Sequence, residues 1–301
     1  MGRMISAFYS PDDNFENVGF VTNNGNVGPA FNDITFMPPA KACNRPVLNS
    51  SPADTQPMIA ACFSPADGFR YFFYCSQTND IHWVGIDKNW HHVNGGTVKQ
   101  VQQPKIPGSI LDIAVFFRDG NINMATLAPN GDVTLLVGSP WAAPNAVWAS
   151  AFLYNIPGAK RIAVFDGAGA GHIIVSTEFD LFEIWYFSNG GFGKSPQPLW
   201  TFRQAILDIG ACLTPGDGVA HIFVANAPSQ LQELVWVPAE VPPVVNQIGF
   251  VNFVIGSIGA YTKLGDKHLV MRDAGNDLFL SWFDPGSPLI HYGPWPQTRA
   301  C

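Results

Sequence analysis

Residues 110–137 read ILDIAVFFRDGNINMATLAPNGDVTLLV and contain three strand-like segments separated by two tight turns. Residues 110–117 are apolar apart from Asp112, residues 123–128 largely alternate between polar and apolar, and residues 132–137 are rich in β-branched side chains. Asp-Gly and Asn-Gly steps between such segments are typical of β-hairpins, because both central residues of a type I′ turn need a positive φ. The stretch therefore predicts an antiparallel meander.

The same layout recurs along the chain. An isoleucine followed by two mostly small residues occurs six times at intervals of 47 to 54 residues, as Ile5, Ile59, Ile113, Ile162, Ile209 and Ile258. A second mark, an amide or acidic residue followed by an aliphatic one, recurs once per repeat at a similar distance after the isoleucine. Repeats of about 50 residues with four short strands are typical of propeller blades. We therefore predict an all-β, six-bladed β-propeller with four antiparallel strands per blade.

The repeat also gives boundaries. We expect a single domain over residues 1–301, with blades at roughly 1–54, 55–107, 108–157, 158–203, 204–252 and 253–301. The strand that carries the isoleucine should be innermost in each blade, where only small neighbouring residues fit. The tail at residues 293–301 follows the last predicted strand and could cross to the first blade.

Composition narrows the classes of partner. The net charge of −7, without a basic stripe, argues against nucleic acid, and no apolar stretch is long enough to span a bilayer. The first residues do not read as a signal peptide, so we expect a cytoplasmic protein or a secreted one whose signal has been removed. No metal, phosphate-loop or dinucleotide motif is present, and we predict neither a metal site nor a cofactor. The sequence leaves open whether the protein forms a homo-oligomer.

The five cysteines allow two interpretations. In the first, they are buried thiols of a reducing compartment. In the second, Cys62 bonds Cys75 across a hairpin, and Cys43 bonds Cys301 and fastens the tail to the first blade.

Hydrogen-bond donors recur on the second predicted strands. His172, His221 and His268 follow their isoleucines by 10, 12 and 10 residues, and Arg70 follows its own by 11. Carboxylates and indoles recur on the third strands. The ligand-binding candidates are Arg70, Trp83, His172, Glu183, Trp185, His221, Glu233, Trp236, His268 and Trp282. A donor, a carboxylate and an indole between blades would suit a sugar, because the polar groups bond hydroxyls and the indole packs against the ring. Alternatively, the histidines bond neighbouring blades and the tryptophans fill blade cores.

A second group lies on the inner strands. Asp112, Arg161 and Asp208 each precede the isoleucine of neighbouring blades, so their side chains should meet near the central channel. They either form an ion-pair cluster that seals the axis or are catalytic candidates at one mouth of the channel.

The chain resembles the fungal fucose-binding lectins of the Aleuria type. In that family the second strand bears an Arg, and the third has the form Ile-Arg-Glu with a Trp after it. The best matches are Leu231-Gln232-Glu233 with Trp236, Leu181-Phe182-Glu183 with Trp185, and Phe69-Arg70-Tyr71 with Ile81-His82. The resemblance implies that such Arg, Glu and Trp sets contact fucose. No blade here has both Arg and Glu at these places.

Three functions follow as hypotheses. The first is a lectin that binds a glycan between blades. The second is an enzyme without a cofactor, with one apolar pocket for a small hydrophobic molecule, such as a fungal natural-product cyclase or pericyclase of the Diels–Alderase type. The third is a protein-interaction scaffold.

Overall fold

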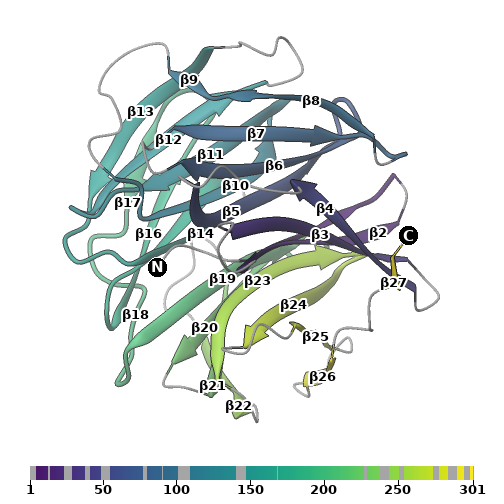
Figure 1. Ribbon diagram of the computed structural model, residues 1–301. Helices are drawn as coiled ribbons and strands as arrows, with labels where there is room; N and C mark the ends of the chain where they lie inside the picture. Colours follow the sequence, from purple (N-terminus) through teal and green to yellow (C-terminus); the bar gives the residue numbers. More distant parts are fainter. Residues whose placement is uncertain are drawn as a thin grey trace. The chain divides into compact units, whose positions relative to one another are not determined.

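The computed structural model of the chain is built of strands and turns (Figure 1). It describes residues 5–12, 14–23, 29–37, 41–48, 55–76, 80–89, 91–100, 109–139, 147–167, 169–226, 229–237, 244–250, 254–273, 278–283, 290–294 and 299–300. These residues form six sheets, in two compact units of three sheets each.

The first unit comprises residues 1–157 and 296–301. Sheet 1 contains β1 (Ile5–Ser10), β2 (Phe15–Asn23), β3 (Pro29–Met37), β4 (Lys41–Leu48) and β27 (Arg299–Ala300). Sheet 2 contains β5 (Thr55–Ser64), β6 (Phe69–Ser76), β7 (Ile81–Ile86) and β8 (His92–Thr97). Sheet 3 contains β10 (Asp112–Arg118), β11 (Asn121–Leu127), β12 (Asp132–Gly138), β13 (Val147–Asn155) and β9 (Lys99–Gln100).

The second unit comprises residues 158–295. Sheet 4 contains β14 (Arg161–Gly167), β15 (Ala170–Ser176), β16 (Asp180–Tyr186), β17 (Phe192–Lys194) and β18 (Trp200–Thr201). Sheet 5 contains β19 (Ile206–Thr214), β20 (Val219–Asn226), β21 (Gln230–Trp236) and β22 (Val244–Phe250). Sheet 6 contains β23 (Ile255–Lys263), β24 (Asp266–Asp273), β25 (Leu278–Phe283) and β26 (Ile290–Pro294).

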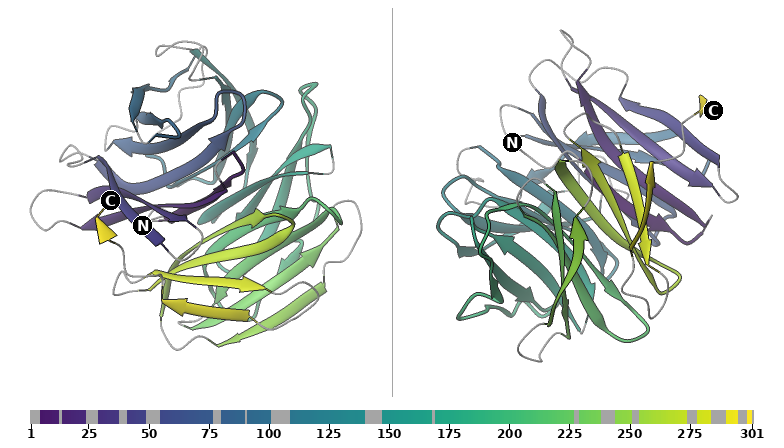
Figure 2. Two further views of the ribbon diagram at one scale, coloured as in Figure 1. Left: turned by 90° about the vertical axis from the view of Figure 1, so that its right-hand side faces the viewer. Right: turned by 90° about the horizontal axis from the view of Figure 1, so that it is seen from below.

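Within each sheet, the four main strands pair antiparallel in chain order, starting from the strand that carries the repeated isoleucine. In the first unit, β1 contacts β5 and β5 contacts β10; in the second, β14 contacts β19 and β19 contacts β23. The three sheets of each unit therefore lie side by side, in contact through their first strands (Figure 2).

The tight turns confirm the hairpin signals of the sequence. Asp119 and Gly120 have φ angles of 50° and 75°, and Leu264 and Gly265 have 52° and 94°. Both central residues of each turn are thus in the left-handed region, as a type I′ turn requires. Glycine holds the second place in both, where it adopts this conformation without steric cost.

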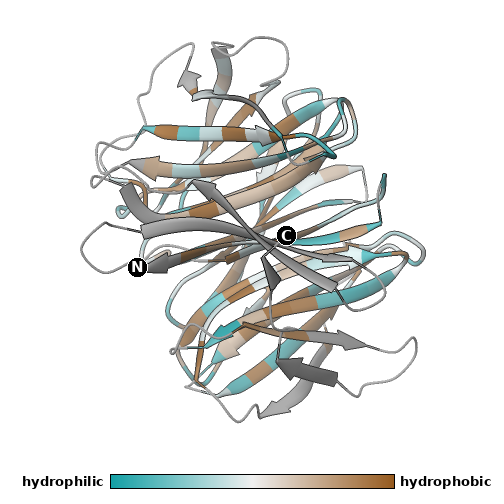
Figure 3. Ribbon diagram, turned by 45° about the vertical axis from the view of Figure 1, so that its right-hand side comes forward, coloured by the Kyte–Doolittle hydropathy of each residue, from teal (hydrophilic) through white to brown (hydrophobic). Residues whose placement is uncertain are grey.

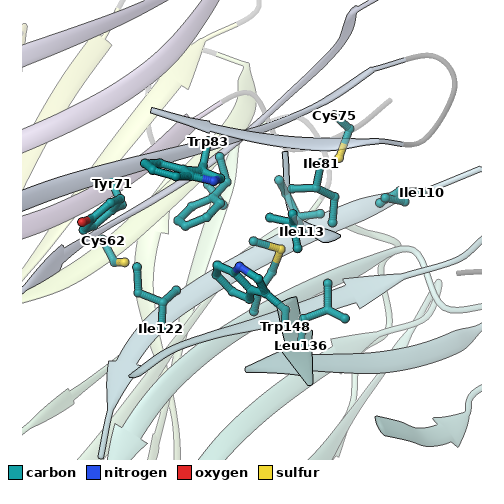
Figure 4. Packing of buried hydrophobic residues seen from close by; sticks show 14 of the residues in the cluster. Cys62, Tyr71, Cys75, Ile81, Trp83, Ile110, Ile113, Ile122, Leu136 and Trp148 are labelled. Carbon is teal, nitrogen blue, oxygen red and sulfur yellow. The ribbon is translucent and has the colours of Figure 1, made fainter. Parts of the chain in front are cut away.

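Apolar side chains fill the space between neighbouring sheets of a unit. Hydrophobic and hydrophilic residues alternate along many strands (Figure 3), and the repeated isoleucine points toward the preceding sheet. Ile113 of β10, for example, is fully buried in a cluster with Phe73 and Trp83 of sheet 2 (Figure 4). Ile258 of β23 packs in the same way with Phe223 of sheet 5. The isoleucine repeat is therefore a packing signal.

The C-terminal segment extends sheet 1. Strand β27 pairs in parallel with β4, with Arg299 opposite Cys43 and Ala300 opposite Asn44. This pairing agrees with the expectation that the tail crosses to the first repeat.

The positions of the cysteines rule out one of the two disulfide bonds considered from the sequence. Cys62, Cys75 and Cys212 are free and buried. Cys62 lies opposite Tyr71, four positions along β6 from Cys75, and the two sulfur atoms lie at opposite ends of the core cluster (Figure 4). A Cys62–Cys75 disulfide is therefore wrong, because bonded cysteines need their Cα atoms within about 7 Å. Cys301 and the side chain of Cys43 lie outside the described residues.

No helix long and apolar enough to cross a membrane occurs in the described part of the chain.

Candidate functional site

The strand register brings three histidines to one equivalent position. His172 lies opposite Phe165 and Trp185, between the first and third strands of sheet 4. His221 has the same place in sheet 5, opposite Cys212 and Val235, and His268 in sheet 6, opposite Tyr261 and Trp282. Each histidine therefore points away from the face of its sheet that carries the isoleucine.

In sheet 4, His172 forms a buried pair with Glu183. Its Nδ1 lies 2.6 Å from Oε1 of Glu183, and only 4% of His172 and 6% of Glu183 is exposed. Its Nε2 lies 3.0 Å from the carbonyl oxygen of Gly167, which can only accept, so Nε2 carries a hydrogen. One further hydrogen then lies between Nδ1 and Oε1. Whichever of these atoms holds it, the pair has no net charge.

Aromatic rings fix the His172 ring. The Phe165 ring stacks on it at 4.7 Å between centroids, with 9° between the planes. Trp236, from sheet 5, meets it edge to face at 6.0 Å and 87°. A carboxylate, an imidazole and an indole therefore meet between sheets 4 and 5, and the indole comes from the neighbouring sheet.

Trp185 lies opposite His172 and on the same face. Its ring packs flat on β17, where a Cβ on Gly193 would lie 2.5 Å from Cζ2 of the indole. Only glycine permits this close approach. Sheet 4 therefore supplies His172, Glu183 and Trp185 to one face, as the sequence predicted.

The grouping of Trp236 with His221 and Glu233 needs a correction. Trp236 lies opposite Ala220, one residue away from the position opposite His221. Because successive side chains of a strand point to opposite faces, Trp236 lies on the other face of sheet 5. It contributes to the site of sheet 4 and not to that of its own sheet.

Sheet 5 repeats the histidine–carboxylate pair. Nδ1 of His221 lies 2.8 Å from Oε1 of Glu233, and Lys267 of β24 in sheet 6 donates to the same oxygen. Burial by itself raises the pKa of a carboxyl group. Here the hydrogen bonds from His221 and Lys267, with the positive charge of Lys267, outweigh burial and hold the pKa of Glu233 below its ordinary value.

The hydroxyl of Thr214 links this pair to the hairpin between β19 and β20. Thr214 Oγ1 donates to Oδ1 of Asp217 and lies 3.2 Å from Nε2 of His221. A hydroxyl has one hydrogen, and here it is directed at Asp217, so Nε2 of His221 donates to Oγ1. Both ring nitrogens of His221 thus face acceptors, as in His172.

Arg70 does not share the position of the histidines. It lies opposite Phe63 and Ile86. Its Nη1 donates to the carbonyl oxygen of Asp87, just after β7 of its own sheet, at 3.1 Å, and its Nη2 donates to Oγ of Ser10 in sheet 1 at 3.5 Å. The ring of Phe15 lies 6.0 Å from the guanidinium carbon. Arg70 lies one residue before the register position that the histidines occupy in sheets 4 to 6, so its side chain is on the opposite face of the sheet.

The equivalent position in sheet 2 belongs to Tyr71, which the sequence reading missed. Tyr71 lies opposite Cys62, and its hydroxyl donates to Oδ2 of Asp67 at 2.5 Å. Burial, with the Asp67 hydrogen bond, raises the pKa of this phenol. In sheet 2, Trp83 occupies the register position that Glu183 and Glu233 occupy in sheets 4 and 5. Trp83 is 2% exposed and packs against Tyr71 in the core cluster. Sheet 2 therefore has an aromatic cluster where sheets 4 and 5 have polar pairs.

In sheet 6, His268 stacks on Tyr261 at 5.2 Å between ring centroids. Trp282 lies opposite His268 in the backbone register, and its side chain is outside the described ones. Leu280 has the place of the carboxylates.

The inner-strand residues form an ion pair in the second unit. Nε of Arg161 lies 3.4 Å from Oδ1 of Asp208, and Oδ2 of Asp208 accepts from Ser257 Oγ and Ile258 N of sheet 6, both at 2.8 Å. Asp208 therefore connects three neighbouring inner strands. Asp112 belongs to the first unit, where it is fully buried and its Oδ1 accepts from Ile113 N at 3.0 Å. A meeting of Asp112 with the other two, and a catalytic role for any of them, stay predictions.

Among the described residues, no group of three or more His, Cys, Asp or Glu side chains could hold a metal ion.

Comparison with known proteins gives matches in structure alone. The sequence matches no protein-family model and no curated protein. The fucose-specific lectin from Aleuria aurantia superposes with a TM-score of 0.73 at 14% identity, over 99% of this chain and 96% of the lectin. Another structure of that fungal lectin, described as a six-bladed β-propeller, gives 0.69 at 13% identity and the same coverage. This chain is a six-bladed β-propeller.

A third match is the SapL1 lectin, in a complex with α-methyl fucoside, with a TM-score of 0.67, 13% identity, and coverage of 98% of this chain and 96% of that one. The propeller fold and the structural likeness to Aleuria-type lectins are thus confirmed over nearly the full chain. At 13–14% identity the likeness concerns the fold. Each of the six sheets is one blade of the propeller.

Proposed function

We propose that this protein binds carbohydrate at sites between neighbouring sheets, chiefly between sheets 4 and 5 and between sheets 5 and 6. The observation that carries the proposal is the repeated histidine–carboxylate pair, at the same register position in two successive sheets. Core packing alone does not require such a pair, because burying polar groups is costly even when they are bonded to each other.

The carboxylates have acceptor capacity that a sugar could use. The contacts with His172, His221 and Lys267 all use Oε1. Among the described residues, Oε2 of Glu183 and Oε2 of Glu233 have no hydrogen-bond partner. A sugar hydroxyl could donate to Oε2, while the imidazole orients the carboxylate through Oε1.

An indole supports the site between sheets 4 and 5. Trp185 lies opposite His172 and is partly exposed, whereas Trp236 of sheet 5 is buried against the His172 ring. A pyranose packs its C–H face on an aromatic ring while its hydroxyls bond polar groups at the ring's rim. The proteins that superpose on this chain include fucose-specific lectins, which supports this use of the fold.

A glycan array tests the proposal. Wild-type protein should bind at least one class of glycan, and Glu183→Gln should weaken that binding by about tenfold or more, because a charged acceptor is replaced by a neutral one. Glu178→Gln is the matched control: Glu178 lies in the turn between β15 and β16, is more than half exposed, and forms a surface ion pair with Lys160. No binding by the wild-type protein to any glycan would refute the proposal.

A further inference from the structure

The face of sheet 4 that carries Glu183 becomes more exposed toward the end of β16. Glu183, Trp185 and Phe187 are every second residue of one extended segment, so their side chains lie on the same face. Glu183 is 6% exposed, Trp185 is partly exposed and Phe187 is 43% exposed. A ligand bound at Glu183 therefore reaches solvent past the two aromatic side chains.

The hairpin between β16 and β17 holds Phe187 on this face. The backbone N of Phe187 donates to the carbonyl oxygen of Gly191 at 2.7 Å, and Gly190 N donates to the carbonyl oxygen of Phe187 at 3.0 Å. Gly190 has a φ of 87°, which closes the turn without steric cost. The ladder thus continues one residue beyond β16, and the alternation of side chains continues with it.

Sheet 5 covers the inner side of the site. A Cβ on Gly167 would lie 2.6 Å from Cδ2 of Leu213, so Leu213 packs directly on the end of β14. Trp236 lies against the ring of His172. The inner strands are therefore covered, and the open direction runs along β16 toward Phe187.

The site between sheets 5 and 6 has no aromatic pair of this kind. The corresponding places beside Glu233 belong to Val235 and Val237, and Val237 is 37% exposed. A branched aliphatic side chain offers a pyranose ring less flat surface than an aromatic ring does. The two proposed sites therefore share the histidine–carboxylate pair and differ in the surface beside it.

We propose that the site between sheets 4 and 5 binds the end of an oligosaccharide, with its terminal sugar at Glu183 and Trp185 and its second sugar packed on the ring of Phe187. Residues two apart on a strand are separated by roughly 7 Å, so sugars on the two aromatic rings would be direct neighbours. The site between sheets 5 and 6 binds a terminal sugar alone. This inference rests on the proposed carbohydrate-binding function and names the ligand class and a specificity-determining residue for one of its sites.

The test is calorimetric titration with pairs of ligands that share a terminal sugar. The pairs are methyl galactoside with methyl lactoside, methyl glucoside with methyl cellobioside, N-acetylglucosamine with chitobiose, and methyl fucoside with fucosyl-N-acetylglucosamine. In at least one pair the wild-type protein should bind the disaccharide about fivefold or more tightly, because the second ring covers apolar surface. Phe187→Ala should lose this advantage and bind the monosaccharide as the wild type does. Phe187→Trp should keep the advantage.

Phe192→Ala is the matched control. Phe192 belongs to the same hairpin and is 46% exposed, but it lies opposite Tyr186 and so on the other face of sheet 4. Its removal should leave both affinities unchanged. Thermal melting establishes that each variant is folded.

The outcomes separate this inference from the function on which it rests. If monosaccharides bind and no disaccharide binds more tightly than its monosaccharide, the inference is wrong and carbohydrate binding stands. The same holds if Phe187→Ala keeps the wild-type ratio of the two affinities, or if Phe192→Ala loses it to the same extent. If no ligand of any pair binds to the wild-type protein, both are wrong.

Discussion

The imidazole of His172 and the indole of Trp236 meet edge to face across sheets 4 and 5, with their ring centroids 6.0 Å apart. Trp236 is 5% exposed and also belongs to the core cluster of the second unit. One side chain therefore packs two neighbouring sheets together and borders a candidate binding site.

Trp236→Ala should lower the free energy of unfolding by roughly 3–5 kcal/mol, because it leaves a large cavity beside His172. Trp236→Phe should cost less, since a ring still fills much of the space. Urea unfolding followed by circular dichroism measures the change. Trp200→Ala is the control, because Trp200 is 36% exposed and its removal should have little effect. Equal stability of Trp236→Ala and wild type would contradict the packing.

Glu233 should make the stability of the folded protein depend on pH in the acidic range. Its pKa is lowered in the folded protein, so its contribution is present above the ordinary pKa of an unfolded glutamate, about 4.3, and is lost as the pH falls through the lower folded value. Melting temperatures of wild type and Glu233→Gln, measured from neutral pH downward, should therefore converge below about pH 4.

Glu178→Gln provides the comparison for that titration, because Glu178 is more than half exposed. Its melting temperature should stay close to that of the wild type throughout. A difference between Glu233→Gln and wild type that persists at the lowest pH would show that the carboxylate is not the source of the stabilisation.

Cys62, Cys75 and Cys212 should not react with a thiol reagent in the native protein. Burial raises the pKa of each thiol, so each is protonated at neutral pH and shielded from solvent. Absorbance with dithionitrobenzoate should report these three only after denaturation. Peptide mapping without reduction should find no Cys62–Cys75 link, and its detection would overturn the described packing of sheet 2.

Substitution of Arg70 should lower the stability of the protein and leave ligand binding unchanged. Arg70→Lys should destabilise the protein by roughly 1–3 kcal/mol, because a single ammonium group cannot reproduce a planar guanidinium bonded to both Asp87 and Ser10. Thermal melting and glycan binding of the same variant check the two parts of this statement. Weaker binding at unchanged stability would restore Arg70 as a ligand-binding residue.

The sequence predicted the fold well because the signals of the fold are local and repeated. The isoleucine mark reports the packing of each first strand on the preceding sheet, and the Asp119-Gly120 turn needs positive φ at both residues. The turn requirement acts within a few residues, and the isoleucine recurs at a nearly constant interval, so both can be recognised without a structure.

The faces of the site residues were harder to predict, because one residue of offset reverses a side chain. Arg70 follows its isoleucine by 11 residues, an odd number, whereas the three histidines follow theirs by 10 or 12. Trp236 follows the aliphatic residue of its mark by 5, whereas Trp185 and Trp282 follow theirs by 4. Attention to odd and even spacing would have selected Tyr71 and separated Trp236 from His221.

Lys267 was missed for a different reason. It directly precedes His268 and therefore faces sheet 5, where Glu233 accepts from it. A contact between residues of different sheets depends on how the two sheets stack, and no local pattern encodes that.

The most direct test of carbohydrate binding is calorimetric titration of the wild-type protein and of the double variant Glu183→Gln/Glu233→Gln with a panel of methyl glycosides that includes α-methyl fucoside. We expect saturable heat of binding with at least one glycoside for the wild-type protein, and loss of this heat in the double variant while the variant remains folded. Absence of heat with every glycoside, or the same heat in both proteins, would contradict it.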